Sequence, residues 1–330
     1  LLVGMTFLLI ATYLILGGVT VANTALTNMA DLVPAKLAEQ GMNGWTVMPD
    51  LGSPIWYTVI TTLVLGVGIG VLAQPQLVVR FMTAKDNRSL NRAVLVGGPF
   101  ILMMTGVAFT VGALTNVYFY QTQGKIAAEV ATAGNIDTII PIFINSAMPE
   151  WFVVLFMVTL LAAAMSTLSS QFHAMGTALI CDVWGRGREC ALSLRANQAG
   201  VLAMIILSVI IAFLMPGSII AIATAMFMGL CASAFLPIFA VAVYCRRPDP
   251  LAAKASLVVG SLAWFIWAFF VNTKYAAVFG LSKALLGKVG VLGYPWNAID
   301  PIVIALPLSA ITILSLQYMR GGCAPEAQTA

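Results

Sequence analysis

Long apolar stretches separated by short polar segments dominate this chain. A membrane-spanning helix needs about 20 mostly apolar residues. Eight stretches meet that length, at residues 1–19, 57–80, 94–116, 151–182, 198–214, 218–245, 255–272 and 299–319. Apolar and polar residues do not alternate over ten-residue blocks, as they would in a membrane β-barrel. The pattern therefore predicts an all-α integral membrane protein with about eight transmembrane helices.

The composition supports this prediction. Of the 330 residues, 61% are hydrophobic and only 8% are charged, whereas a soluble domain is about half apolar and about a quarter charged. These values exclude a soluble enzyme, a disordered regulator and a nucleic-acid-binding domain. We expect a multi-pass protein of the cell membrane whose partners are the lipid bilayer and a small molecule. No nucleic acid and no obligatory protein partner is expected.

Lysine and arginine predict the orientation, because they concentrate in cytoplasmic loops. If the eight helices alternate in direction, eleven of the sixteen basic residues fall on one side, in short connections. These are Arg80, Lys85, Arg88, Arg92, Arg186, Arg188, Arg195, Arg246, Arg247, Lys254 and Arg320. We predict that this side is cytoplasmic and that the chain enters the membrane from it.

The fourth stretch carries polar groups at its centre. It is bounded by Glu150 and Asp182, and a helix of that length spans roughly 48 Å, about a bilayer with its headgroups. Ser166 and Thr167 lie at its midpoint. At 100° per residue Ser166 belongs to a narrow polar stripe, formed by Thr159, Ser166, Ser170, His173 and Thr177. The stripe is also compatible with close helix packing, which small and hydroxylated residues favour.

The second stretch contains residues that weaken a helix. Gly66, Gly68 and Gly70 precede Gln74 and Pro75, and glycine and proline disrupt helical hydrogen bonding. Broken helices are a common means by which transporters expose backbone groups to substrates and ions. A simple packing kink is the alternative. A milder interruption of 218–245, at residues 229–237, is assigned to packing.

The side chains favour an ion site over a catalytic one. The single histidine, His173, lies three residues after Ser170 with no third group to orient it, which is weak support for a nucleophile. No H-E-x-x-H motif or C-x-x-C pair occurs, so no enzyme activity and no metal other than sodium is expected. Sodium is a hard cation that prefers oxygen ligands. Two hydroxyls at the midplane and carbonyls freed at a helix break would supply them without formal charge.

At this point the chain resembles the sodium:solute symporter family, in its proline/pantothenate-like branch. Three segments carry the resemblance in the family's order. They are Gln74–Met82, which begins Gln-Pro-Gln, then Ala162–Gln171 (Ala-Ala-Ala-Met-Ser-Thr-Leu-Ser-Ser-Gln), and Gly229–Pro237. The chain departs from these relatives at Ala73 and Gln76, where they often carry glycine and histidine.

The resemblance implies a LeuT-type fold of two inverted five-helix repeats. Residues 1–19 would be the fifth core helix, so the first four core helices are expected to precede this chain. Residues 1–320 would form a single transmembrane domain, with a short cytoplasmic tail at 321–330. The resemblance also implies site residues. Sodium would be bound by Ala163, Ser166 and Thr167, and the solute by Gly68, Gly70, Gln74, Ser170 and His173.

Together these observations predict sodium-coupled symport of a small polar organic solute, such as a carboxylate or an amino acid. The alternative is a transporter-like membrane sensor, although the ten residues after 320 carry no signalling module. A lipid-modifying membrane enzyme is a third possibility, for which the sequence offers no convincing reactive group. We do not expect residues 1–330 to transport alone.

Overall fold

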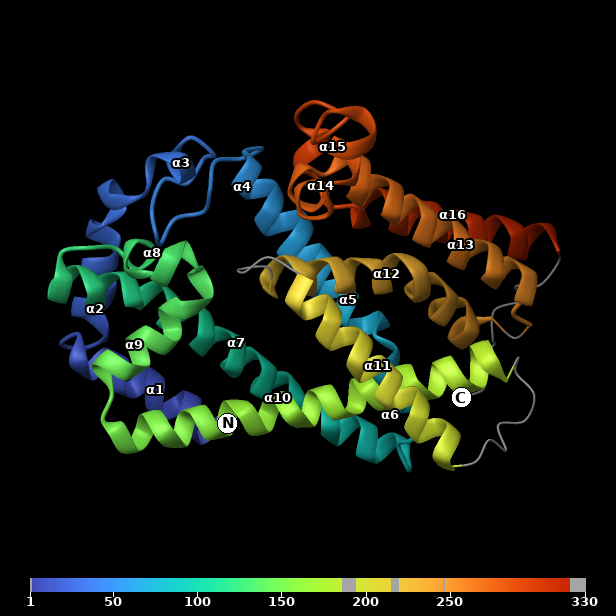
Figure 1. Cartoon of the computed structure of the whole chain (residues 1–330), viewed down its shortest axis with the longest axis horizontal. Coiled ribbons are helices and arrows are strands. Elements are labelled where there is room, and N and C mark those ends of the chain that lie inside the picture. The colour runs from blue at the N-terminus through green and yellow to red at the C-terminus, as the bar shows by residue number, and fades with distance from the viewer. Residues whose placement is uncertain (1, 186–193, 215–219, 246, 321–330) are drawn as a thin grey trace. The chain divides into compact units, whose positions relative to one another are not determined.

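The computed structural model describes residues 2–185, 194–214, 220–245 and 247–320, and all the regular elements in them are helices (Figure 1). The chain forms two compact units. Unit 1 comprises Leu1–Leu32 and Ala84–Ile219, and unit 2 comprises Val33–Thr83 and Ile220–Ala330. The predicted arginines at 186, 188 and 246 and the predicted tail at 321–330 lie outside the described residues. The single domain over 1–320 stays a prediction.

Unit 1 contains the following helices, of which η6 is a π-helix and the other η elements are 3₁₀-helices: α1 (Leu2–Ile15), α2 (Val19–Asn28), η1 (Ala30–Leu32), α7 (Asn87–Gln123), α8 (Ala127–Val130), η4 (Thr132–Gly134), η5 (Ile136–Thr138), α9 (Ile139–Ala147), α10 (Glu150–Ala178), η6 (Leu179–Trp184) and α11 (Leu194–Leu214).

Unit 2 contains these helices, of which η2 and η7 are π-helices: α3 (Ala35–Ala38), α4 (Pro54–Tyr57), η2 (Thr58–Val67), α5 (Gly68–Gly70), η3 (Val71–Ala73), α6 (Pro75–Met82), α12 (Ile220–Tyr244), α13 (Pro250–Ile266), η7 (Trp267–Val271), α14 (Thr273–Phe279), α15 (Leu281–Leu286), η8 (Trp296–Ala298) and α16 (Ile302–Met319).

Seven of the eight predicted stretches are confirmed as helices long and apolar enough to cross a membrane. In the described residues these spans are Pro54–Ala73, Asn87–Gln123, Glu150–Trp184, Leu194–Leu214, Ile220–Tyr244, Pro250–Val271 and Ile302–Met319. The packing interpretation of 229–237 is also confirmed, because α12 continues through this region and buries Gly229, Ser233 and Pro237.

The first predicted stretch, residues 1–19, differs in its bounds. Its helix, α1, covers Leu2–Ile15, and α2 follows at an angle of 73°. Gly17 and Gly18 at the break have φ angles of 85° and 104°, a region that glycine adopts without steric cost. Helix α2 then extends to Asn28, into a segment that the hydropathy pattern assigned to a loop.

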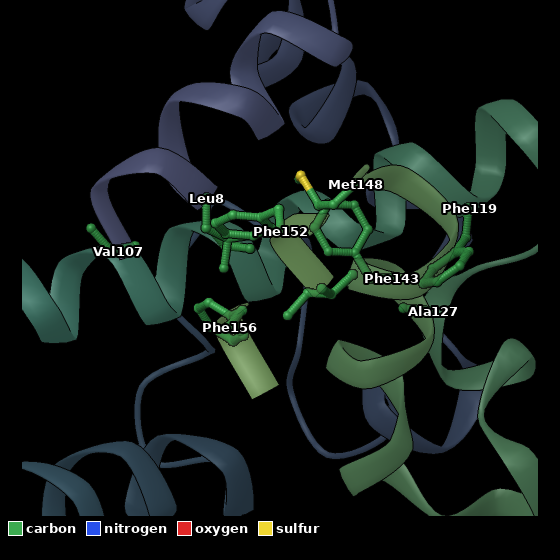
Figure 2. Packing of buried hydrophobic residues seen from close by; sticks show 10 residues of the cluster. Leu8, Val107, Phe119, Ala127, Phe143, Met148, Phe152 and Phe156 are labelled. Atoms are coloured by element: carbon green, nitrogen blue, oxygen red, sulfur yellow. The ribbon is translucent and has the colours of Figure 1, made fainter. Parts of the chain in front are cut away.

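The core of unit 1 is an aromatic cluster between α1, α7, α9 and α10. Phe143 and Phe119 lie together with their ring centroids 6.3 Å apart, and Phe152 packs beside Leu8 (Figure 2). The long helix α7 is capped at its N-terminus. The side chain of Asp86 accepts a hydrogen bond from the Ser89 backbone N–H, as N-cap residues do. These contacts fix the base from which α10 extends.

The core of unit 2 is the group formed by α12, α13 and α16, of which α13 and α16 lie side by side (Figure 1). Small residues allow the close approach. The Ser256 and Ser309 hydroxyl oxygens are 2.9 Å apart, linking α13 to α16. A side chain at Gly260 would overlap the backbone carbonyl of Ser233 in α12. These contacts follow the rule that small and hydroxylated residues line helix interfaces in membranes.

Gln317 fastens α16 to the turn between α12 and α13. This side chain is buried, donates to the Arg247 carbonyl at 2.7 Å, and accepts from the Asp249 backbone N–H at 2.9 Å. Arg320, one turn later, pairs with the Asp249 carboxylate at 3.4 Å. Gln317 therefore pairs two backbone groups of this turn with its own buried amide.

Replacing Gln317 with leucine should lower the melting temperature, because it removes two hydrogen bonds that contribute about 0.5–1.5 kcal/mol each. Thermal denaturation of the detergent-purified protein measures the effect. Thr312→Val is the matched control, since the hydroxyl of Thr312 is exposed and bonds only to its own helix, at Leu308. Equal melting temperatures for the two variants would contradict the role of Gln317.

Candidate ion and solute site

Helix α10 positions the predicted sodium ligands. Pro149 precedes it in an extended conformation and Glu150 occupies its first turn, a sequence typical of a helix start. With η6 it forms one 35-residue span from Glu150 to Trp184. The length deduced from the flanking acidic residues is thus confirmed, and Ser166 lies near the middle of the span.

The structure brings the three predicted sodium residues together around one carbonyl. The Ser166 hydroxyl donates to the Ala163 carbonyl oxygen at 2.8 Å, and the Thr167 hydroxyl donates to the same oxygen at 3.1 Å. Serine and threonine in helices commonly bond in this way to the preceding turn. Ser170 continues the chain of polar groups, because its hydroxyl donates to the Thr167 carbonyl at 2.8 Å.

This group of atoms has the chemistry of a hard-cation site. All three atoms that could coordinate a cation are oxygens. A hydroxyl that donates one hydrogen bond keeps lone pairs with which to coordinate the cation. Ser166 and Thr167 are exposed and Ala163 is half-buried, so a ligand can reach these oxygens. Hard cations take oxygen ligands, and more than three of them. The residues of α10 therefore fit sodium but supply only part of its coordination.

His173 lies apart from this group, in a groove between α10 and α11. The groove has a volume of about 340 Å³ and is lined by His173, Asn197, Gln198 and Val201 among others, but not by Ser166, Thr167 or Ser170. The Thr177 hydroxyl donates to the Asn197 side-chain oxygen at 3.3 Å in the same interface. The far end of the predicted polar stripe therefore faces α11.

The predicted break in the second span is confirmed. The π-helix η2 leads into α5 and η3, then Gln74 is extended, with φ −68° and ψ 123°, and Pro75 opens α6. Proline at the first position of a helix needs no partner for a backbone N–H. Gln74 is buried, and its side-chain oxygen accepts from the Gln76 amide at 3.0 Å.

The two glycines predicted to contact solute differ in their surroundings. Gly70 is buried against α12, where an added Cβ would lie 2.6 Å from the Met228 carbonyl carbon. Gly68 is exposed, and an added Cβ there would meet no atom within 4 Å. Gly70 thus allows a close backbone approach, whereas Gly68 leaves open space.

The predicted site residues belong to two different units. Ala163, Ser166, Thr167, Ser170 and His173 lie in unit 1, and Gly68, Gly70 and Gln74 lie in unit 2. Each set is locally ordered as described. That the two sets form one binding site stays a prediction.

The sequence analysis missed a buried acidic residue in unit 2. Asp300 precedes α16 and is only 1% exposed. Its carboxylate accepts a hydrogen bond from the Tyr275 hydroxyl at 2.6 Å. The sequence did contain a signal, namely an Asp-Pro pair at the start of an apolar run with no basic residue nearby. It was missed because Asp300, like the other acidic residues, lies at the edge of a predicted loop.

Comparison with known proteins relates the chain to a family of membrane transporters. The family model for the sodium:solute symporter family matches residues 1–260. The chain is 28% identical over 212 residues to the high-affinity proline transporter PutP of Bacillus subtilis, covering 61% of this chain and 42% of that protein. It is 25% identical over 300 residues to the sodium/pantothenate symporter of Haemophilus influenzae, covering 86% and 56%. The chain spans about half the length of these relatives.

Proposed function

The chain belongs to the sodium:solute symporter family, and we propose that it forms the greater part of the ion and solute pathway of a sodium-coupled carrier. It is a multi-pass membrane protein. In the proposed activity, sodium moving down its gradient carries a small polar organic solute across the cytoplasmic membrane. The observation that carries the proposal is the convergence of two hydroxyls on the Ala163 carbonyl at the centre of α10.

Sodium is a cargo in this scheme and is bound only by neutral oxygens. The Ala163 carbonyl and the hydroxyls of Ser166 and Thr167 would provide its ligands on α10. A site without formal negative charge binds an abundant ion weakly and releases it readily, as transport requires. The exposure of this face supports a further proposal, that helices of the first repeat supply the remaining oxygens.

The solute is proposed to bind beside the break in the second span. Gly68 leaves open space there and Gln74 offers an amide, while Gly70 lets α5 pack on α12. Ser170 and His173 would contribute from unit 1. The relatives are named as carriers of proline and of pantothenate, both small carboxylates, so we propose a small carboxylate or amino acid as the solute.

Uptake into proteoliposomes that contain the complete gene product tests this function. With an inward sodium gradient, radiolabelled L-proline or pantothenate should accumulate above its external concentration. With choline in place of sodium, accumulation should be absent. Carrier-mediated uptake that is equal in sodium and in choline would contradict sodium coupling.

A further inference from the structure

A buried carboxyl connects three elements of unit 2 around the broken span. Asp300 accepts from the Tyr275 hydroxyl of α14 at 2.6 Å and from the Ile302 backbone N–H of α16 at 3.0 Å. Its own backbone N–H donates to the Thr61 hydroxyl of η2 at 3.1 Å. Asp300 thus lies where the π-helical first half of the broken span meets α14 and α16.

Within the part of the chain that the structure describes, no cation pairs with this carboxyl. In the described residues, the ion pair that the structure shows is Arg320 with Asp249, at the opposite end of α16. Lys274, next to Tyr275, donates instead to the Thr58 hydroxyl of η2 at 2.5 Å. An ionised carboxylate that is buried without a cation is costly, because a low-dielectric interior does not solvate it.

The surroundings of the carboxyl also include an unpaired donor. The Trp264 indole N–H of α13 is buried without a hydrogen-bond partner. A Cβ added to Gly229 of α12 would lie 3.2 Å from the indole nitrogen and 3.5 Å from an Asp300 carboxyl oxygen. The indole nitrogen and the carboxyl therefore both border this glycine. Buried unpaired donors are rare, so water entering this region would satisfy the indole as well as the carboxylate.

Few titratable groups face Asp300. Helix α14 carries Tyr275, which bonds to the carboxyl, and Lys274, which bonds to Thr58, and α12 carries the Cys231 thiol two residues after Gly229. The nearby residues of η2, α13 and α16 carry none. Burial raises the pKa of the Asp300 carboxyl, although hydrogen bonds from Tyr275, Ile302 and Thr62 oppose the shift. Burial and the charge of Asp300 raise the pKa of Tyr275, and burial lowers the pKa of Lys274.

We propose that Asp300 is a proton-linked positioning residue, whose neutral carboxyl favours packing of η2 against α14 and α16. When the carboxyl O–H bond breaks, the proton passes to water and the carboxylate keeps the electron pair. The ionised form then favours release of η2 toward water. The packed state binds the proton more tightly than a hydrated one, so it loses stability as pH rises above the ordinary range of an aspartate. The consequence for transport rests on the proposed function.

Hydrogen exchange of residues 58–67, in the complete gene product in lipid nanodiscs, tests this linkage. After correction for intrinsic rates, the opening equilibrium of the wild type should increase with pH, by up to about tenfold per pH unit for one released proton. Asp300→Asn mimics the neutral carboxyl and should remain protected at every pH. Asp249→Asn, at the other end of α16, is the matched control and should keep the wild-type dependence.

Two further measurements separate this role from a merely structural one. Asp300→Asn should melt at or above the wild-type temperature near neutral pH, since its side chain cannot ionise and so cannot favour the open state. Its transport turnover should nevertheless fall, with little change in half-saturation by sodium. Tyr275→Phe removes a donor to the carboxylate, so the ionised packed state becomes less stable and the opening at high pH should exceed that of the wild type. The inference is overturned if wild-type protection does not depend on pH, if Asp300→Asn keeps the dependence, or if Asp300→Asn is destabilised. Failure of the wild type to transport would contradict the proposed function but not the exchange result.

Discussion

Replacing both Ser166 and Thr167 with alanine should abolish the dependence of uptake on sodium within the accessible concentration range. Both hydroxyls lie at the Ala163 carbonyl, at 2.8 and 3.1 Å, and are the proposed ligands from α10. An interaction with a charged group contributes about 1.5–3 kcal/mol. Losing two of them should weaken sodium affinity by roughly two to four powers of ten, at about 1.4 kcal/mol per decade.

Initial uptake rates measured against sodium concentration in proteoliposomes give this result. Thr159→Ala is the matched control, because it removes an exposed hydroxyl of the same helix that bonds only to Leu155. Its half-saturating sodium concentration should match that of the wild type. The assignment of the ion site is wrong if the double variant retains normal sodium activation.

Replacing Gly70 with alanine should destabilise unit 2 and impair transport. The new Cβ would lie 2.6 Å from the Met228 carbonyl carbon and 2.7 Å from its Cβ, so α5 and α12 would have to separate. Overpacking of this kind costs about 1–3 kcal/mol. Helix α5 is joined to Gln74 by the single turn η3, so the geometry of the break would change with it.

Gly68→Ala is the comparison for this prediction, two residues earlier in the same short helix. Its Cβ would meet no atom within 4 Å, and alanine is favoured over glycine in helices by about 1 kcal/mol. Thermal denaturation should therefore show a lower melting temperature for Gly70→Ala and an unchanged or higher one for Gly68→Ala. Equal losses in both variants would show that steric contact with α12 is not the cause.

The sequence predicts features that depend on neighbours along the chain. The spans follow from runs of apolar residues, and the break at Gln74 follows from the glycines and proline around it. The proposed sodium ligands are equally local, since Ser166 and Thr167 follow Ala163 by three and four residues on one helix. Their convergence on one carbonyl is a property of helical geometry and is accessible from sequence alone.

Features that depend on distant segments could not be predicted in this way. The bend between α1 and α2 falls at Gly17 and Gly18, at the end of the apolar run, and hydropathy predicts neither its angle nor the helix that follows it. The Asp300 cluster joins residues 239 positions apart, through its bond to Thr61. The partners of His173 in the groove come from α11, which the periodicity of α10 cannot reveal.

Equilibrium binding of radioactive sodium to the purified complete gene product tests the central claim most directly, because it needs no knowledge of the solute. The wild type and Thr159→Ala should bind sodium saturably and with the same affinity. Ser166→Ala combined with Thr167→Ala should show no saturable binding over that range. Equal sodium binding by the wild type and the double variant would contradict an ion site on α10.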